Sequence, residues 1–272
     1  MKHILNLVKY ALLFAGVFVV LFPIYSVFVG AFKDRQEFFE NRLALPSSWS
    51  LDNFATAWDK GDLPLALGNT GIILVVSIVG NIMIGTMSAY ALGRFDFKGK
   101  QIIITSYLIA AVIPLITTQV VTYSVIKGLG LYNTMGAPIV LYLGADVIQL
   151  IIYLQFIKNI PKELDESAMM EGASLFRIFA TIIFPLLGPA TATVVILKFI
   201  AIYNDFYVPY LYMPDRELRT VATAIQSFVG PNAARLEVIS AYIMLIFIPT
   251  SVVFLFMQRY IFSGVTSGAV KS

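Results

Sequence analysis

The sequence predicts an all-α integral membrane protein with six transmembrane helices, because of its composition and of where its charges lie. Hydrophobic residues make up 58% of the 272 residues, and charged residues make up only 13%. An ordinary globular domain has about 25% charged residues. With a mean hydropathy of +0.82, too few polar side chains remain to cover a surface that faces water. The composition therefore excludes a soluble enzyme, a disordered chain and a nucleic-acid-binding module.

Six charge-poor runs are each long enough to cross a bilayer. About 20 helical residues, at ~1.5 Å rise each, cross the ~30 Å of hydrocarbon. The expected spans are residues 10–32, 66–92, 102–125, 137–157, 187–212 and 238–260, within a single transmembrane domain of residues 1–272. The first run is longer than the apolar region of a signal peptide and lacks a cleavage pattern before Lys33. We therefore expect it to be a retained helix.

The basic residues favour a cytoplasmic location for both termini. With the N-terminus inside, the inner segments carry ten Lys and Arg residues and the outer loops carry eight. An excess of Lys and Arg marks the cytoplasmic side of a membrane protein. The sequence therefore predicts a multi-pass protein of the cell membrane, with the long loop 158–185 in the cytoplasm.

Several kinds of chemistry are excluded by missing residue types. The chain has no cysteine, and His3 is its one histidine. Disulfide frameworks, thiolate zinc sites and Ser-His or Cys-His catalysis are therefore excluded. The segment 93–100 departs from the nucleotide-binding loop in its spacing and in Gln101, which stands where Ser or Thr is required. If ATP drives this protein, another chain binds it.

The loop 158–185, KNIPKELDESAMMEGASLFRIFATIIFP, predicts a helix, a turn and a second helix. Pro161 suits a first helical turn, and three acidic residues follow it at the positive end of the helix dipole. Gly172 can end this helix in the left-handed conformation, and Ser174 can cap the next one. An amphipathic helix on the bilayer is the alternative, but acids outnumber bases here, on the leaflet that attracts cations. A protein partner with a basic groove fits better.

This loop resembles the EAA motif (E-A-A-x-x-x-G, nine residues, I-x-x-P) of the permeases of binding-protein-dependent ABC importers. Ser167 stands for the first alanine of that motif, and Glu171 stands for the usual aspartate. GLGLYNT at 128–134, YNDF at 203–206 and QRYIFSGVTSGAVKS at the C-terminus resemble the carbohydrate-uptake branch, and within it the maltose-type second permease subunit. The matching loop residues are Glu166, Ser167, Ala168, Glu171, Gly172, Ala173 and Pro185.

The resemblance implies one permease subunit of an ATP-driven importer for a sugar or oligosaccharide, a transporter subunit and not an enzyme. It implies a second permease subunit in a heterodimer, two ATPase subunits, an extracellular solute-binding protein that docks on outer loops such as 213–237, and surrounding membrane lipid. The EAA loop would form a coupling helix in an ATPase groove, with Glu166 opposite a basic residue. ATP and Mg would be held by the ATPase subunits, so no cofactor is expected in this chain.

Polar and aromatic residues within the spans form a candidate substrate path. Charges at membrane depth are costly and face a bundle interior or a watery cavity. Lys198 and Asp205 are expected on one face of the fifth span, and Asp146 and Gln149 on one face of the fourth. Alternatively, Lys198 pairs with an acid, and the two aspartates lie at the membrane interface. The candidates are Gln119, Tyr123, Asp146, Gln149, Lys198, Tyr203, Asn204, Asp205 and Tyr207. Tyr203 stands where the resembled family usually has tryptophan.

Other functions remain as alternatives. A secondary transporter or channel would typically show internal repeats, and none of useful strength is visible. An ABC permease for a non-sugar solute would share the same loop motif. A membrane-embedded enzyme would need a nucleophile and a base at membrane depth, where only Asp146, Lys198 and Asp205 are charged.

Overall fold

Helices joined by loops make up the described part of the chain. A computed structural model describes residues 2–230 and 234–269. Within these ranges, β pairing is limited to one isolated bridge between Val229 and Ala234. A helix satisfies its backbone N–H and C=O groups within its own segment, as lipid requires. The chain divides into two compact units, Met1–Leu67 with Thr223–Val253 and Gly68–Ala222 with Phe254–Ser272.

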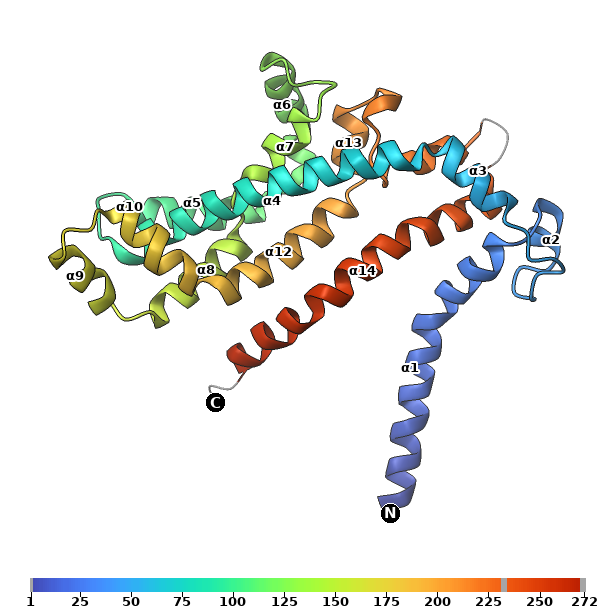
Figure 1. Cartoon of the computed structure of the whole chain (residues 1–272), viewed down its shortest axis with the longest axis horizontal. Helices are drawn as coiled ribbons and strands as arrows, with labels where there is room; N and C mark the ends of the chain where they lie inside the picture. Colours follow the sequence, from blue (N-terminus) through green and yellow to red (C-terminus); the bar gives the residue numbers. More distant parts are fainter. Residues whose placement is uncertain (1, 231–233, 270–272) are drawn as a thin grey trace. The chain divides into compact units, whose positions relative to one another are not determined.

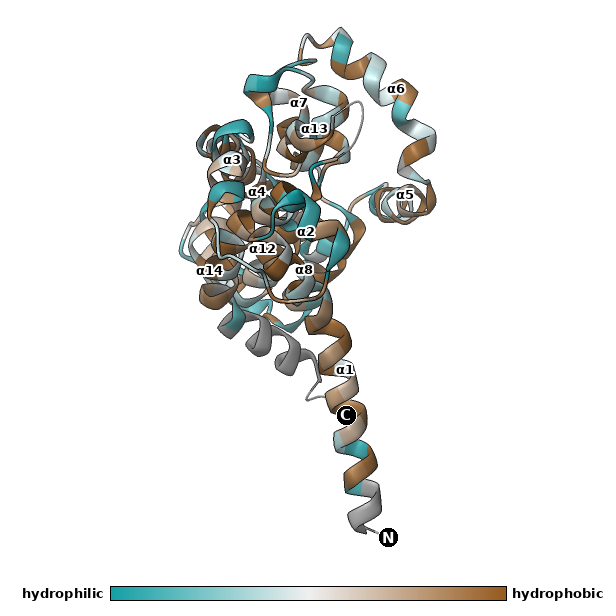
Figure 2. Ribbon diagram, turned by 90° about the vertical axis from the view of Figure 1, so that its right-hand side faces the viewer, coloured by the Kyte–Doolittle hydropathy of each residue, from teal (hydrophilic) through white to brown (hydrophobic). Residues whose placement is uncertain are grey.

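The first unit contains a long apolar helix and short polar helices. Figure 2 shows hydrophobic residues along most of α1 (Lys2–Ala31) and polar residues in the segments around α2 and α3. Asp34 begins α2, where its carboxylate accepts the N–H of Glu37 at 2.8 Å. The other elements of this unit are α2 (Arg35–Glu40), α3 (Asp52–Lys60), η3 (Ala224–Phe228) and the first part of α14 (Leu236–Ala269).

The second unit contains most of the helices, shown along the chain in Figure 1. They are most of α4 (Leu63–Arg94), then α5 (Lys100–Val112), α6 (Leu115–Gly128), α7 (Gly136–Leu143), α8 (Val147–Asn159), α9 (Glu163–Met170), α10 (Leu175–Ile178), the π-helix η1 (Phe179–Ile183), α11 (Phe184–Leu186), α12 (Gly188–Tyr203), α13 (Tyr207–Tyr212) and η2 (Arg216–Leu218).

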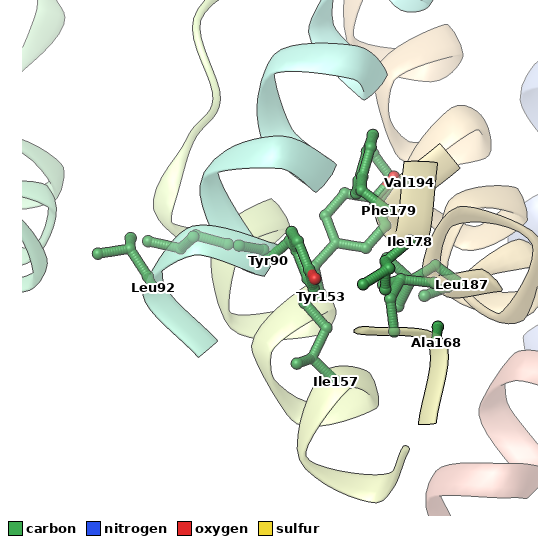
Figure 3. Close-up of a cluster of buried hydrophobic side chains, with 13 residues drawn as sticks. Tyr90, Leu92, Tyr153, Ile157, Ala168, Ile178, Phe179, Leu187 and Val194 are labelled. Carbon is green, nitrogen blue, oxygen red and sulfur yellow. The ribbon is translucent and has the colours of Figure 1, made fainter. Parts of the chain in front are cut away.

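A buried core joins α4, α8, α9 and α12 in this unit. Figure 3 shows Tyr90, Tyr153 and Phe179 from three different helices in one cluster, with Ile178 and Leu187 on one side of it. Tyr153, Ile178 and Leu187 are completely buried. This core fixes the place of the loop 158–185, because residues on both sides of its turn are part of it.

Three helices are long and apolar enough to cross a membrane, within the described residues: Asn6–Ala31, Leu63–Arg94 and Leu236–Phe256. Three further pairs of helices reach this length only together. They are bent by 111° between α5 and α6, by 44° between α7 and α8, and by 75° between Leu175–Leu186 and α12. Counting each pair as one span gives six, so the number of spans stays a prediction.

Two expectations about shared helix faces are wrong, because the helices break at the aspartates. Asp205 follows the end of α12, and its Oδ1 accepts the N–H of Val208 at 3.1 Å, in the first turn of α13. Asp146 precedes α8, and its Oδ1 accepts the N–H of Gln149 at 2.8 Å. A short carboxylate satisfies the free N–H groups at a helix start. Asp146 is therefore the N-cap of α8, and Asp205, one residue before the N-cap Phe206, satisfies an N–H of the first turn of α13.

Glycines on α4 allow the broken helix pair α7–α8 to approach it closely. A Cβ atom added to Gly85 would lie 2.2 Å from Nε2 of Gln149, which is almost completely buried. That amide nitrogen donates to the main-chain oxygen of Asn81 at 3.1 Å. A side chain at position 85 would therefore push the amide away from its partner.

We expect Gly85→Ala to destabilise the protein by about 1–3 kcal/mol relative to Gly71→Ala, the usual cost of overpacking a core. The lost Gln149 hydrogen bond adds to this cost. Gly71→Ala on the same helix is the matched control, because its added Cβ meets no atom within 4 Å and alanine favours a helix by ~1 kcal/mol over glycine. Thermal unfolding in detergent measures both; equal midpoints for the two variants would contradict the close approach.

Candidate coupling surface and membrane cavity

The turn after α9 forms as the sequence predicts. Gly172 has φ +82°. Its N–H donates to the oxygen of Met169 at 2.9 Å, and the N–H of Ala173 donates to the oxygen of Ala168 at 3.0 Å. This pair of bonds is the Schellman motif, which satisfies the last carbonyls of a helix. Ser174 then caps α10 by accepting the N–H of Arg177 at 3.3 Å.

We expect Gly172→Val to strain this turn. A Cβ atom at position 172 meets no atom within 4 Å, so the cost comes from the left-handed backbone, about 1–2 kcal/mol for a residue other than glycine. Gly172→Asn is the control, because asparagine tolerates this conformation. Thermal unfolding should therefore rank glycine first, asparagine second and valine last, and a valine variant as stable as asparagine would contradict the strain.

One face of α9 packs on the core and the opposite face is exposed. Ala168 is buried, whereas Met170 is 88% exposed. Among the other residues of the predicted EAA motif, Ala173 is half-buried, and the exposed ones are Glu166, Ser167, Glu171, Gly172 and Pro185. The turn therefore presents carboxylates and thioethers side by side on a rigid base, a surface suited to a partner with both basic and apolar groups.

Sequence reasoning missed the buried residues that hold α9 in place. Arg94, the last residue of α4, forms a salt bridge with Asp165 at 3.0 Å, and the two side chains are only 6% and 10% exposed. Tyr90, one turn earlier, donates its hydroxyl to Oδ1 of Asp165 at 3.0 Å. Arg94 also donates to the main-chain oxygen of Pro161 at 3.3 Å. The sequence did contain a signal for this contact, because Asp165 is an acid in the first turn of a helix and its side chain faces the apolar stripe of that helix.

An exposed ion pair lies just beyond the end of α4. Lys100 donates to Oδ1 of Asp96 at 2.9 Å, and this hydrogen bond lowers the pKa of the Asp96 carboxyl. Because the Asp96 side chain is exposed to solvent, the pair contributes little to stability.

A cavity of about 660 Å³ opens in the second unit between α6, α7 and α13. It contains three of the candidate path residues: Gln119, Asp205 and Tyr207. The remaining lining residues are Pro114, Ile116, Thr118, Thr122, Leu141, Tyr142, Val208 and Tyr212. The lining combines apolar side chains with a few hydroxyl, amide and carboxylate groups, as is typical of small-molecule sites.

Two hydrogen bonds organise the polar groups of the cavity. Tyr142 donates its hydroxyl to Oδ2 of Asp205 at 2.8 Å. Tyr212 donates to Oε1 of Gln119 at 3.2 Å. Tyr142 and Tyr212 are absent from the sequence-based candidates, since nothing in the order of residues places them beside Asp205 and Gln119.

The remaining candidates lie outside this cavity lining. Lys198 forms an ion pair with Asp146 at 2.8 Å, which is the pairing that the sequence left open as an alternative. Gln149 faces α4. The last three are accounted for by contacts with neighbouring groups: Tyr123 stacks on Tyr212, Tyr203 stacks on Phe199, and the Asn204 amide donates to Ile200 O.

The family model described as "Binding-protein-dependent transport system inner membrane component" matches residues 10–267. The chain belongs to this family. The permease is therefore a multi-pass protein of the cell membrane and a transporter subunit.

Similar proteins agree with this assignment. The permease is 34% identical over 269 residues to the probable starch degradation products transport system permease protein AmyC of Thermoanaerobacterium thermosulfurigenes, which covers 97% of each chain. It is 32% identical over 251 residues to the melibiose/raffinose/stachyose import permease protein MelC of Bacillus subtilis (strain 168), covering 92% of this chain and 91% of that one.

A third relative is the trehalose/maltose transport system permease protein MalG of Thermococcus litoralis, 32% identical over 260 residues, with 93% and 92% of the two chains covered. Among solved structures, a bacterial ABC transporter involved in the import of the acidic polysaccharide alginate matches with a TM-score of 0.84 and 18% identity, over 95% of this chain and 97% of that chain. At this identity the match shows the shared fold of the permease.

Proposed function

We propose that this permease is one subunit of an ATP-driven importer for a sugar or oligosaccharide and forms half of its translocation path. The observation that carries the proposal is the rigidly held turn after α9, with exposed Glu166 and Met170 on a buried base of Ala168. Such a surface can transmit force from a partner because it cannot tilt independently of the core. The relatives described above, named for their oligosaccharide transport, support the sugar as substrate.

The family to which the permease belongs supports a set of partners. Two ATPase subunits hold ATP and Mg and receive the coupling turns, with Glu166 opposite a basic residue. A second permease subunit completes the path, and an extracellular solute-binding protein docks on outer loops such as 213–237. Six spans place both termini and the segment 158–185 in the cytoplasm.

The cavity is the part of the path that this subunit provides. Asp205 and Gln119 accept hydrogen bonds, as sugar hydroxyls require, and the exposed Tyr207 ring suits the apolar face of a sugar. Lys198 and Asp146 form an ion pair in which their charges neutralise each other. Each of the two residues lies close in sequence to one of the two helix starts, those of α8 and α13. Their ion pair reduces the cost of two charges at membrane depth.

Reconstitution tests the proposal. The permease, its second permease subunit, the ATPase and the binding protein are placed in proteoliposomes with ATP on the ATPase side. We expect labelled oligosaccharide to accumulate only when all four components and ATP are present. Uptake without the ATPase would favour a secondary transporter or channel, and uptake of only non-sugar solutes would contradict the substrate class.

A further inference from the structure

Helix α4 makes buried polar contacts near both ends of its part in the second unit and also midway between them. Asn69 and Thr70 lie near one end, Asn81 in the middle, and Tyr90 and Arg94 at the other end. The side chains at these five positions are almost fully buried. Polar groups are costly to bury, so such groups form specific hydrogen bonds.

The contact at the end of α4 fixes the orientation of α9. Tyr90 donates its hydroxyl to Oδ1 of Asp165 at 3.0 Å, and the Arg94 guanidinium lies 3.0 Å from Oδ2 in an ion pair and donates to the main-chain oxygen of Pro161 at 3.3 Å. A buried ion pair often stabilises a fold no more than apolar residues would, but loss of one partner is costly. Hydrogen bonds also depend on direction, whereas apolar surfaces can slide. Helix α9 therefore cannot rotate against α4 without losing this contact.

The contact near the start of α4 holds main-chain atoms of the segment 217–221. Asn69 donates through Nδ2 to the oxygens of Glu217 at 2.8 Å and Arg219 at 3.0 Å. The hydroxyl of Thr70 accepts the N–H of Val221 at 3.0 Å. These bonds fix the path of the segment independently of its own side chains.

The middle contact holds the break between α7 and α8. Asn81 donates through Nδ2 to the oxygen of Gly144 at 2.7 Å and to that of Tyr142 at 3.1 Å. At ~1.5 Å per residue, the contacts of Asn69 and Arg94 are about 37 Å apart along one continuous helix. One stiff element thus holds three segments that are distant in sequence.

We propose that α4 acts as a connecting rod, a rigid helix that carries a movement of α9 to the segment 217–221. The positioning residues that make its contacts at the two ends are Asn69, Thr70, Tyr90, Arg94 and Asp165. The proposal rests on the proposed coupling role of α9. A helix with all its internal hydrogen bonds moves as a rigid body, and directional contacts at both ends make the attached segments follow it. The segment 217–221 lies in the loop proposed to face the binding protein, so ATP would change that loop through α4.

A reporter at the far end of the rod tests this inference. The chain has no cysteine, so Glu217→Cys places one thiol at an exposed position of the segment. The complete transporter in proteoliposomes is trapped with ATP and vanadate, and the rate of maleimide labelling from outside is compared with the nucleotide-free state. We expect the rate to change on trapping.

Variants at the two ends should reduce this change while nucleotide trapping persists. Mutations of residues along a coupling route change the coupling between two sites by factors of about 2 to 30. We expect such a reduction for Thr70→Val, which removes only the accepting hydroxyl, and for Asp165→Asn. Thr70→Ser should retain the change, because it retains the hydroxyl. Asp96→Asn is the matched acid-to-amide control, since Asp96 is exposed beside the end of α4.

The outcomes test the role of α4 as a connecting rod separately from the coupling role of α9. A full labelling response in both Thr70→Val and Asp165→Asn, or no response in the parent, would overturn the rod. If Asp165→Asn does not assemble, Thr70→Val alone decides. Glu166→Ala tests the coupling turn directly. A full response in that variant refutes the coupling role, whereas its loss together with a full response in both Thr70→Val and Asp165→Asn refutes only the role of α4.

Discussion

Glu166→Ala is expected to leave the permease folded and inserted in the membrane while it weakens ATPase binding and sugar-stimulated ATP hydrolysis. Glu166 is exposed at the turn, so its removal leaves the core unchanged. Truncating one partner of a hydrogen-bonded charge pair at an interface costs about 2–5 kcal/mol. A cost in this range corresponds to at least about a 30-fold weaker association. Titration of ATPase onto permease in detergent measures the loss.

The control for this variant is Glu163→Ala, which removes an exposed acid from the same short helix but from outside the EAA motif. It should retain ATPase binding close to that of the parent. Equal weakening in both variants would mean that general negative charge, and not a specific contact at Glu166, attracts the ATPase. Unchanged binding and hydrolysis in Glu166→Ala would remove the turn from the coupling surface.

Asp205→Asn is expected to lower the specificity constant for sugar uptake by about 10- to 150-fold, because a hydrogen bond to a charged group contributes about 1.5–3 kcal/mol. The amide retains an oxygen that can cap α13 in place of the Asp205 carboxylate, so the local helix start should persist. Uptake kinetics in proteoliposomes should show this loss, while complex assembly and basal ATP hydrolysis stay near those of the parent.

Tyr142→Phe tests whether the pair of Tyr142 and Asp205 contributes to substrate binding or only to the stability of the cavity. It removes the hydroxyl that donates to Asp205 and leaves the ring in place. If Asp205 binds substrate, both variants should change the preference between sugars without a matched loss of thermal stability. Unchanged uptake in Asp205→Asn would exclude this cavity from the substrate route, whereas a loss of stability that parallels the loss of uptake would assign the pair to structure.

The helix breaks show where sequence periodicity failed. Charge-poor runs indicate an apolar environment, but they do not say whether one helix continues through it. Pro114 marks the break between α5 and α6, because proline lacks an N–H donor and restricts the residue before it. Asp146 and Asp205 gave a weaker signal. From the sequence, an acidic side chain within a span is equally consistent with a charge in the substrate path and with the cap of a new helix.

The sequence by itself determined the helical membrane class, the turn at Gly172 and the exposed acidic motif that follows Asp165. These features depend on composition and on contacts between residues close in the chain. Only the tertiary structure decided that Arg94 and Tyr90 hold α9, that Lys198 pairs with Asp146, and that Tyr142 reaches Asp205 across 63 residues. Such pairs depend on how helices pack, and packing brings together residues whose separation in sequence carries no periodic signal.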